Sequence, residues 1–219
     1  MAAQASALER SKRIEDALDA YTVLSRLDRT NALAWEGRGR CLIELGRNSE
    51  ALAALERALT VEPELEWGHY NIGWLLHIKL GDPERAIGHF QRAIERLPHH
   101  ALPVAGKAYS LVMVGSPHEA LEVLREALED PELDDAFELH TALGAAHYHG
   151  GEPEKALAAY EKAKEEAGEG HPGIELSIIE ILIQLDRREA AQSRLADMAE
   201  DDHAPGRGVG APASGEVRG

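Results

Sequence analysis

The chain of 219 residues is 44% hydrophobic and 28% charged, with a formal net charge of −16 at pH 7. This acidity argues against nucleic acid as a partner, because the phosphate backbone requires a basic surface. A membrane span is excluded as well, since no apolar run reaches the required length of about 18 residues.

The N-terminal segment and the cysteine content bear on the cellular compartment. MAAQASALERSKRIEDAL reaches charged residues within ten positions and lacks the apolar core of a secretory signal. Cys41 is the only cysteine, so neither a disulfide framework nor a thiolate metal cluster is expected. We therefore expect a cytoplasmic protein.

Four segments align in one register: LGRNSEALAALERAL, LGDPERAIGHFQRAI, VGSPHEALEVLREAL and GGEPEKALAAYEKAK. In each, a glycine precedes an alanine by five residues, and a second alanine follows seven residues later. Weaker copies flank the four. The first alanines are spaced by 34, 35, 34, 36 and 35 residues, at Ala17, Ala51, Ala86, Ala120, Ala156 and Ala191. A fixed period of this length is typical of repeat architectures.

Each unit predicts two helices joined by a tight turn. Glycine ends the first helix, since it tolerates the left-handed conformation at a helix C-terminus. Proline then occupies the first position of the second helix, where its missing N–H costs nothing. Asp82 and Ser116 are the predicted N-caps. The turn residues are Gly46, Gly81, Gly115 and Gly151, followed in three units by Pro83, Pro117 and Pro153.

The first helix of each unit carries a large residue, a small one and another large one, as in Trp35, Gly39 and Leu42. Together with the later alanines and proline of AWEGRGRCLIELGRNSEALAALERALTVEP, this pattern resembles the tetratricopeptide repeat. The resemblance covers roughly residues 5–198. It implies an all-α, right-handed superhelical solenoid of antiparallel helix pairs, with about five to six repeats.

The expected repeats span approximately residues 1–31, 32–65, 66–100, 101–136, 137–171 and 172–203. The segment APGRGVGAPASGEVRG, residues 204–219, has no periodicity and predicts a disordered tail. The 35-residue step between Ala51 and Ala86 predicts one extra residue in a first helix or its turn. The 36-residue step near EDPELDDAF predicts a bend of the superhelix, and Asp186 replaces the turn glycine of the last copy.

Trp67, Tyr70 and Trp74 fall at i, i+3 and i+7 and therefore share one helix face. By resemblance to the family, this face lines the concave groove that binds ligands. The groove residues that the resemblance implies are Glu36, Arg40, Trp67, Tyr70, Asn71, Trp74, His77, Leu102, Tyr109, Val112, Met113, Thr141, Tyr148 and His149. We expect the rings to anchor a partner and Arg40, Asn71, His77 and His149 to orient it.

The resemblance implies a non-catalytic scaffold or adaptor that binds a partner peptide or helix. Residues 101–219 carry 10 Lys and Arg against 24 Asp and Glu, so the partner is expected to have basic flanks unless the acidity serves only solubility. A chaperone for a secreted or assembling partner and a self-assembling scaffold are the alternatives. In the alternative interpretation of the aromatic residues, the rings bind no partner and only stiffen the solenoid. The family's carboxylate clamp is not expected, because aromatic residues replace most of its basic positions.

The sequence predicts no cofactor, no metal and no enzymatic activity. His140 and His147 share a helix face but lie too far apart along it to bind one ion, about 10.5 Å at 1.5 Å per residue. Both fall on core positions of the repeat, where a hydrogen-bonded histidine is expected. Cys41 is interpreted as a packed thiol. No arrangement of nucleophile, base and oxyanion site is evident.

Overall fold

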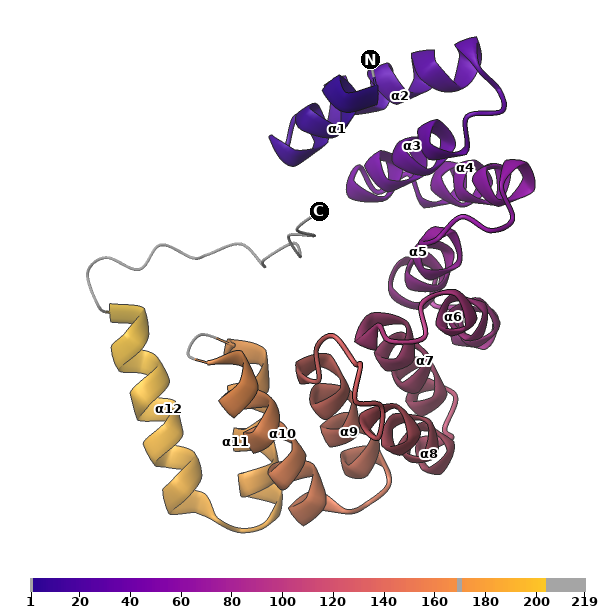
Figure 1. Ribbon diagram of the computed structural model, residues 1–219. Coiled ribbons are helices and arrows are strands. Elements are labelled where there is room, and N and C mark those ends of the chain that lie inside the picture. Colours follow the sequence, from indigo (N-terminus) through magenta and orange to yellow (C-terminus); the bar gives the residue numbers. More distant parts are fainter. Residues whose placement is uncertain (1, 169–170, 204–219) are drawn as a thin grey trace.

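The computed structural model describes residues 2–168 and 171–203, and helices are the only regular secondary structure in this part of the chain (Figure 1). In chain order these elements are α1 (Ala2–Arg10), α2 (Ile14–Leu27), α3 (Ala32–Glu44), α4 (Asn48–Val61), α5 (Gly68–Trp74), the π-helix η1 (Leu75–Leu80), α6 (Pro83–Arg96), α7 (Ala101–Met113), α8 (Pro117–Leu128), α9 (Phe137–His149), α10 (Pro153–Ala167), α11 (Pro172–Gln184) and α12 (Arg188–His203). The predicted tail, residues 204–219, lies outside the described residues.

Consecutive helices pack in antiparallel pairs, and the pairs follow one another along an arc (Figure 1). From α1–α2 to α7–α8, the first helix of each pair lies on the inner side of the arc and the second on the outer side. The expectation of an all-α solenoid is thus confirmed. No helix among the described residues is both long and apolar enough to cross a membrane.

The turns within the pairs follow the predicted chemistry with one exception. The turn glycines have φ values of 71°, 63°, 82° and 76°, and Asp186 adopts the same left-handed conformation with φ of 56°. The carboxylate of Asp82 accepts a hydrogen bond from the Arg85 N–H at 3.2 Å, as an N-cap should. Ser116 occupies the N-cap position of α8, but its side chain makes no capping hydrogen bond, so this part of the prediction is wrong.

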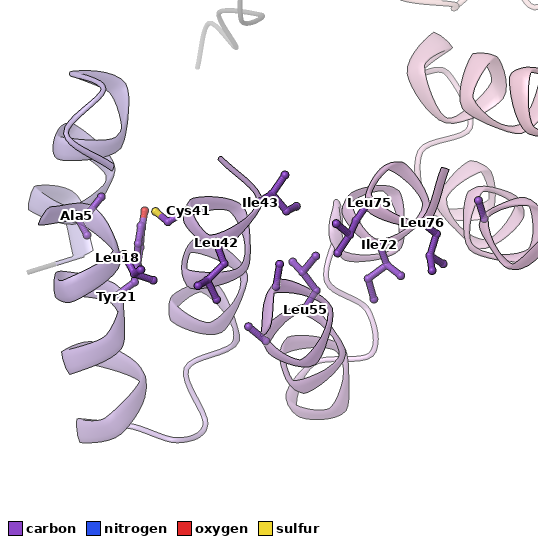
Figure 2. Close-up of a cluster of buried hydrophobic side chains, with 14 of the residues drawn as sticks. Ala5, Leu18, Tyr21, Cys41, Leu42, Ile43, Leu55, Ile72, Leu75 and Leu76 are labelled. Carbon is purple, nitrogen blue, oxygen red and sulfur yellow. The ribbon is translucent and has the colours of Figure 1, made fainter. Parts of the chain in front are cut away.

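The buried residues form four clusters that reach across neighbouring helices, because each second helix from α2 to α10 packs between two first helices. Figure 2 shows this for the N-terminal half, where Leu42, Leu55 and Ile72 come from three successive helices. Small residues allow the close approach. A Cβ added to Gly39 would lie 2.7 Å from the Leu55 side chain, and one on Gly144 would lie 2.7 Å from the Tyr160 ring. Each repeat therefore depends on its neighbours for burial.

The predicted extra residue of the third pair is confirmed as a π-helix, η1. The Asp82 N–H bonds to the carbonyl of Leu76, six residues earlier, at 2.9 Å. In the second pair the matching bond, from Arg47 to Leu42, spans five residues. The additional residue therefore lies between Leu76 and Gly81, and the helix absorbs it by widening its last turn.

The two residues added before α9 lengthen the loop 129–136. This loop packs on the loop 97–100 that precedes α7. Asp134 accepts a hydrogen bond from the Ala101 N–H at 2.9 Å, and its own N–H donates to the His99 carbonyl at 2.9 Å. His99 also contacts Asp130 at 2.8 Å. The predicted bend of the superhelix at this point stays a prediction.

Candidate functional site

Helices on the inner side of the arc carry five aromatic residues of the predicted groove, Trp67, Tyr70, Trp74, His77 and Tyr109. Trp67 precedes α5, and its ring meets Tyr70 edge-on with centroids 5.4 Å apart. The His77 and Tyr109 rings lie 6.5 Å apart and join η1 to α7. All five side chains are half-buried. The first helices of the third and fourth repeats therefore carry two ring contacts, Trp67 with Tyr70 and His77 with Tyr109.

The same rings also contact the interior, which keeps the stiffening interpretation open. Tyr70 and Trp74 pack against the N-terminal core, and the Tyr70 ring lies 6.0 Å from the ring of buried Phe90. The Lys79 ammonium sits 5.5 Å from the centre of the Trp74 ring. These rings therefore stabilise the helix packing as well as lining the inner surface.

Exposed apolar side chains extend the surface beyond the rings. Among the predicted residues, Leu102 is 40% exposed and Met113 57% exposed, whereas Val112 is half-buried. The sequence reasoning missed Leu33, Ile78, Leu176 and Ile183, which are all more than half exposed. Each lies one repeat period from a predicted residue, so the repeat spacing itself would have identified them.

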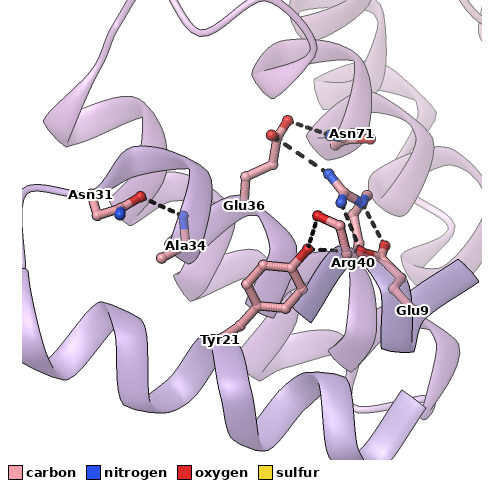
Figure 3. Close-up of polar contacts among 8 residues, drawn as sticks. Glu9, Tyr21, Asn31, Ala34, Glu36, Arg40 and Asn71 are labelled. Atoms are coloured by element: carbon pink, nitrogen blue, oxygen red, sulfur yellow. Dashed lines mark hydrogen bonds and ion pairs between the residues drawn. The ribbon is translucent and has the colours of Figure 1, made fainter. Parts of the chain in front are cut away.

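The N-terminal end of the groove is polar and engaged internally (Figure 3). Arg40 forms two hydrogen bonds with Glu9, at 2.8 and 2.9 Å, and lies 3.5 Å from Glu36. Asn71 donates to the other oxygen of Glu36 at 2.9 Å. Burial raises the pKa of Glu36, which is only 6% exposed, although Arg40 and Asn71 oppose the shift.

This network engages Glu36, Arg40 and Asn71, and their predicted role in the groove stays a prediction. Their polar groups already bond to one another and to Glu9 of α1, so they tie the first three repeats together. The sequence could place Glu36 and Arg40 on one face of α3 and Asn71 on the first helix of the next repeat, but it could not reveal Glu9, which comes from a weak copy of the repeat. A ligand would have to displace these contacts to reach the three side chains.

At the C-terminal end, two of the predicted residues are also engaged. Thr141 donates to the Phe137 carbonyl of its own helix at 2.9 Å. The Tyr148 hydroxyl donates to Glu180 of α11 at 2.8 Å, which raises the pKa of Tyr148. His149 is exposed, and its ring lies edge-on to Tyr148 at 5.4 Å.

Comparisons with known proteins agree with the repeat pattern. Sequence profiles described as tetratricopeptide repeat match residues 2–64 and 105–172 in one case and residues 68–100 in another. The chain belongs to the tetratricopeptide repeat (TPR) family. Among curated proteins, none matches the sequence.

Solved TPR structures share the fold. PilW, a widely conserved type IV pilus biogenesis factor, is 19% identical with a TM-score of 0.82, over 92% of this chain and 91% of PilW. A TPR protein from Parabacteroides merdae ATCC 43184 is 21% identical with a TM-score of 0.72, over 91% and 76% of the two chains. YrrB, described as a TPR protein with an unusual peptide-binding site, is 26% identical with a TM-score of 0.60, over 74% and 81%.

One residue of the TPR groove that the sequence reasoning missed is Glu138, the second residue of α9. Its side chain is half-buried, and no hydrogen bond or ion pair to its carboxylate occurs within the described residues. Burial raises the pKa of Glu138, and Asp135 adds to the shift while His171 opposes it. Glu138 follows Leu102 by one 36-residue repeat, so the period marks it as a groove position.

The charge of Glu138 contributes to the pKa shifts of Tyr70 and Tyr109. Burial and, after it, the charge of Glu138 raise the pKa of Tyr70 to about 12, and the same two causes raise the pKa of Tyr109. Neither phenol oxygen bonds to another described residue, and neither is a fully buried atom.

His140, His147 and Cys41 lie at packed positions. His140 is buried and bonds to Glu166 at 2.7 Å, and His147 bonds to Glu152 at 2.7 Å, as expected of core histidines. Burial raises the pKa of Cys41 to about 12, so its thiol stays protonated. In the described part of the chain, no group of three or more His, Cys, Asp or Glu is placed to hold a metal ion.

A histidine pair that the sequence reasoning did not consider joins α5 to α6. The Nδ1 atoms of His69 and His89 are 3.1 Å apart. Burial, followed by His69 and Arg92, lowers the pKa of His89 to about 4. Both rings are therefore neutral at pH 7, and one donates a hydrogen bond to the other. We interpret the pair as a packing contact between neighbouring helices.

Proposed function

We propose that the protein is a non-catalytic scaffold or adaptor that binds a partner peptide or helix in the groove between α5 and α9. The observation that carries this proposal is the distribution of exposed apolar side chains. Of the ten large ones among the described residues, seven lie on first helices or η1. Exposed apolar surface concentrated on one side of a protein marks an interaction site.

The family and one relative support this function. TPR proteins bind protein partners, and YrrB has a peptide-binding site on the same fold. The aromatic rings of the predicted groove are of the kind that dominates interfaces, each costing about 2 kcal/mol or more on truncation. Two or three such anchors, with Leu102 and Met113 beside them, suffice for a micromolar complex of about −8 kcal/mol. The single buried cysteine favours a cytoplasmic location for this activity.

The test replaces groove side chains that the fold does not need. Leu102→Ser and Met113→Ser together remove two exposed apolar groups from α7. The matched control is Val23→Ser with Leu27→Ser, which removes two similarly exposed groups from the outer helix α2. Random peptides displayed on phage are selected on the wild-type protein, and the retained peptides are synthesised with a fluorescent label.

We expect the groove variant to weaken peptide binding roughly 100-fold, because each apolar side chain contributes about 1.5–3 kcal/mol when buried by the ligand. The α2 variant should bind as wild type does. Fluorescence polarisation measures both affinities, and circular dichroism melts check that both variants fold. Equal binding by the groove variant, or no retained peptide at all, would contradict the proposal.

A further inference from the structure

His69 of α5 and His89 of α6 bring two ring nitrogens, Nδ1 and Nδ1, to within 3.1 Å of each other. The ring centroids lie 5.2 Å apart and the ring planes are tilted by 46°, so the rings meet through their nitrogens and do not stack. At this distance only one proton fits between the two nitrogens, so at least one of them presents a lone pair. Both side chains are half-buried on the paired helices of the third repeat, which hold the nitrogens together.

The packing of the repeat does not require a histidine on both helices. In each of the other aligned copies, the second helix carries a small apolar residue where α6 carries His89. The corresponding residues are Trp35 with Ala54, Val104 with Val123, and His140 with Ala159. A half-buried imidazole gives up hydration that an apolar side chain does not need. The pair in the third repeat therefore has a cost that packing alone does not explain.

The separation of the two nitrogens matches that of two ligands on one metal ion. Zinc binds imidazole nitrogen at about 2.0–2.1 Å with tetrahedral angles, which places two such ligands about 3.3 Å apart. The pair therefore has to open by only about 0.2 Å from its 3.1 Å contact. The ring that donates the shared proton carries it on Nε2 instead, so both Nδ1 atoms offer lone pairs and no proton is released.

A cavity of about 280 Å³ beside the two rings gives an ion access to them. Both histidines line it, together with residues of α4, α5, α6 and the loop at Pro63. Glu56 contributes a carboxylate to the lining, and Arg92 contributes an opposing positive charge. No third ligand is in place among the described residues, so water takes the remaining positions on the ion.

We propose that His69 and His89 bind a divalent transition-metal ion of the zinc class through their Nδ1 atoms. Without an ion, the pair is the packing contact described above. This inference goes beyond the proposed function, since no predicted groove residue lines the cavity. The sequence reasoning expected no metal because it compared histidines close together in the chain, whereas these two lie 20 residues apart. Because the two ligands come from different helices, the ion binds only the folded pair and stabilises it.

The experiment uses the full-length protein without a histidine tag, freed of metal by a chelator. Isothermal titration calorimetry measures zinc binding to wild type, His69→Gln, His89→Gln and the control His118→Gln. His118 is an exposed residue of the outer helix α8, so its substitution removes a histidine away from the pair. Wild type and His118→Gln should bind one ion per chain with equal affinity. The other two variants should bind about tenfold more weakly or worse, as loss of a ligand or its support does.

A second measurement locates the ion in the wild-type protein and so does not depend on whether a variant folds. In ¹H–¹⁵N spectra of the imidazole rings, the Nδ1 signals of His69 and His89 should move when zinc is added. Magnesium has the same charge but prefers oxygen ligands, so it should leave both signals in place. Zinc should also raise the melting temperature of wild type but not that of His89→Gln.

Three results would overturn the inference. Zinc affinity that is equal in all four proteins would place the ion elsewhere, and so would Nδ1 signals of the pair that stay in place at saturation. An equal response to zinc and magnesium would show a general effect of charge on an acidic chain. The substitutions of Leu102 and Met113 test the peptide groove separately, so either proposal can fail without the other.

Discussion

The charge of Glu138 opposes folding. Its pKa is raised in the folded protein, first by burial and then by Asp135, with His171 opposing the shift. The folded state therefore holds the proton more tightly than the unfolded chain, and ionisation penalises the fold. The penalty is absent below the ordinary pKa of 4.5, grows as the pH rises toward the raised pKa, and is complete above it.

From this sign we predict that Glu138→Gln is more stable than wild type at pH 7. Below pH 4.5, where the wild-type side chain is protonated in both states, the difference should disappear. Urea unfolding at the two pH values measures the free energy of unfolding of each protein. Glu122→Gln, at an exposed position of the outer helix α8, should match wild type at both. A Glu138→Gln protein that is less stable at pH 7 would show that the carboxylate has a structural role.

Other residues show where sequence reasoning succeeds and where it stops. Trp67, Tyr70 and Tyr109 could be placed on one surface because the repeat period fixes their position on the helix. Arg40 could be placed there as well, but not its bonds to Glu9, because a contact between side chains 31 positions apart leaves no local pattern. The same period relates Glu138 to Leu102 and would have identified it, but the sequence reasoning did not include it.

The helices pack as closely as they do because glycine stands at the contacts. On α7, a Cβ added to Gly106 would lie 2.5 Å from Cε1 of Phe90, a ring of α6 that is itself buried. Gly88 on α6 faces open space, with no atom within 4 Å of its added Cβ. Both glycines lie inside α-helices, so the two positions differ in packing but not in secondary structure.

We predict that Gly106→Val lowers the free energy of unfolding by about 1–3 kcal/mol, the usual cost of an overpacked contact. Gly88→Val makes the same chemical change on an exposed surface and should stay within about 0.5 kcal/mol of wild type. Thermal and urea unfolding measure the free energy of unfolding of both variants. Because both replace a helical glycine by valine, the change in helix propensity cancels in the difference between them. Equal stability of the two variants would mean that α7 can move away from α6 without loss.

Element positions were largely predictable because each copy of the repeat supports the same boundaries. The turn glycines and the prolines that open α6, α8 and α10 fix helix ends by local chemistry. The spacing showed that the third pair holds one extra residue but not that η1 would absorb it, because a longer turn would have the same spacing. Whether an added residue widens a helix or lengthens a loop depends on tertiary packing.

At the level of the whole molecule, the solenoid follows from repetition and the partner does not. Each helix pair buries its apolar residues only against its neighbours, so a chain of matching pairs specifies an extended array. The array leaves apolar side chains exposed on its first helices, Leu102 and Met113 among them. The fold does not specify which molecule binds there. The only indications of its chemistry are the apolar side chains and the one unpaired charge of the proposed groove.

The most direct test of the groove is an NMR titration of protein carrying ¹³C-methyl methionine with a phage-selected peptide. The chain has three methionines, of which Met113 lies in the groove and Met198 lies on α12, a second helix. The account predicts that the Met113 methyl signal shifts in proportion to the bound fraction while the Met198 signal stays in place. A saturated complex with Met113 unmoved would contradict binding in the groove.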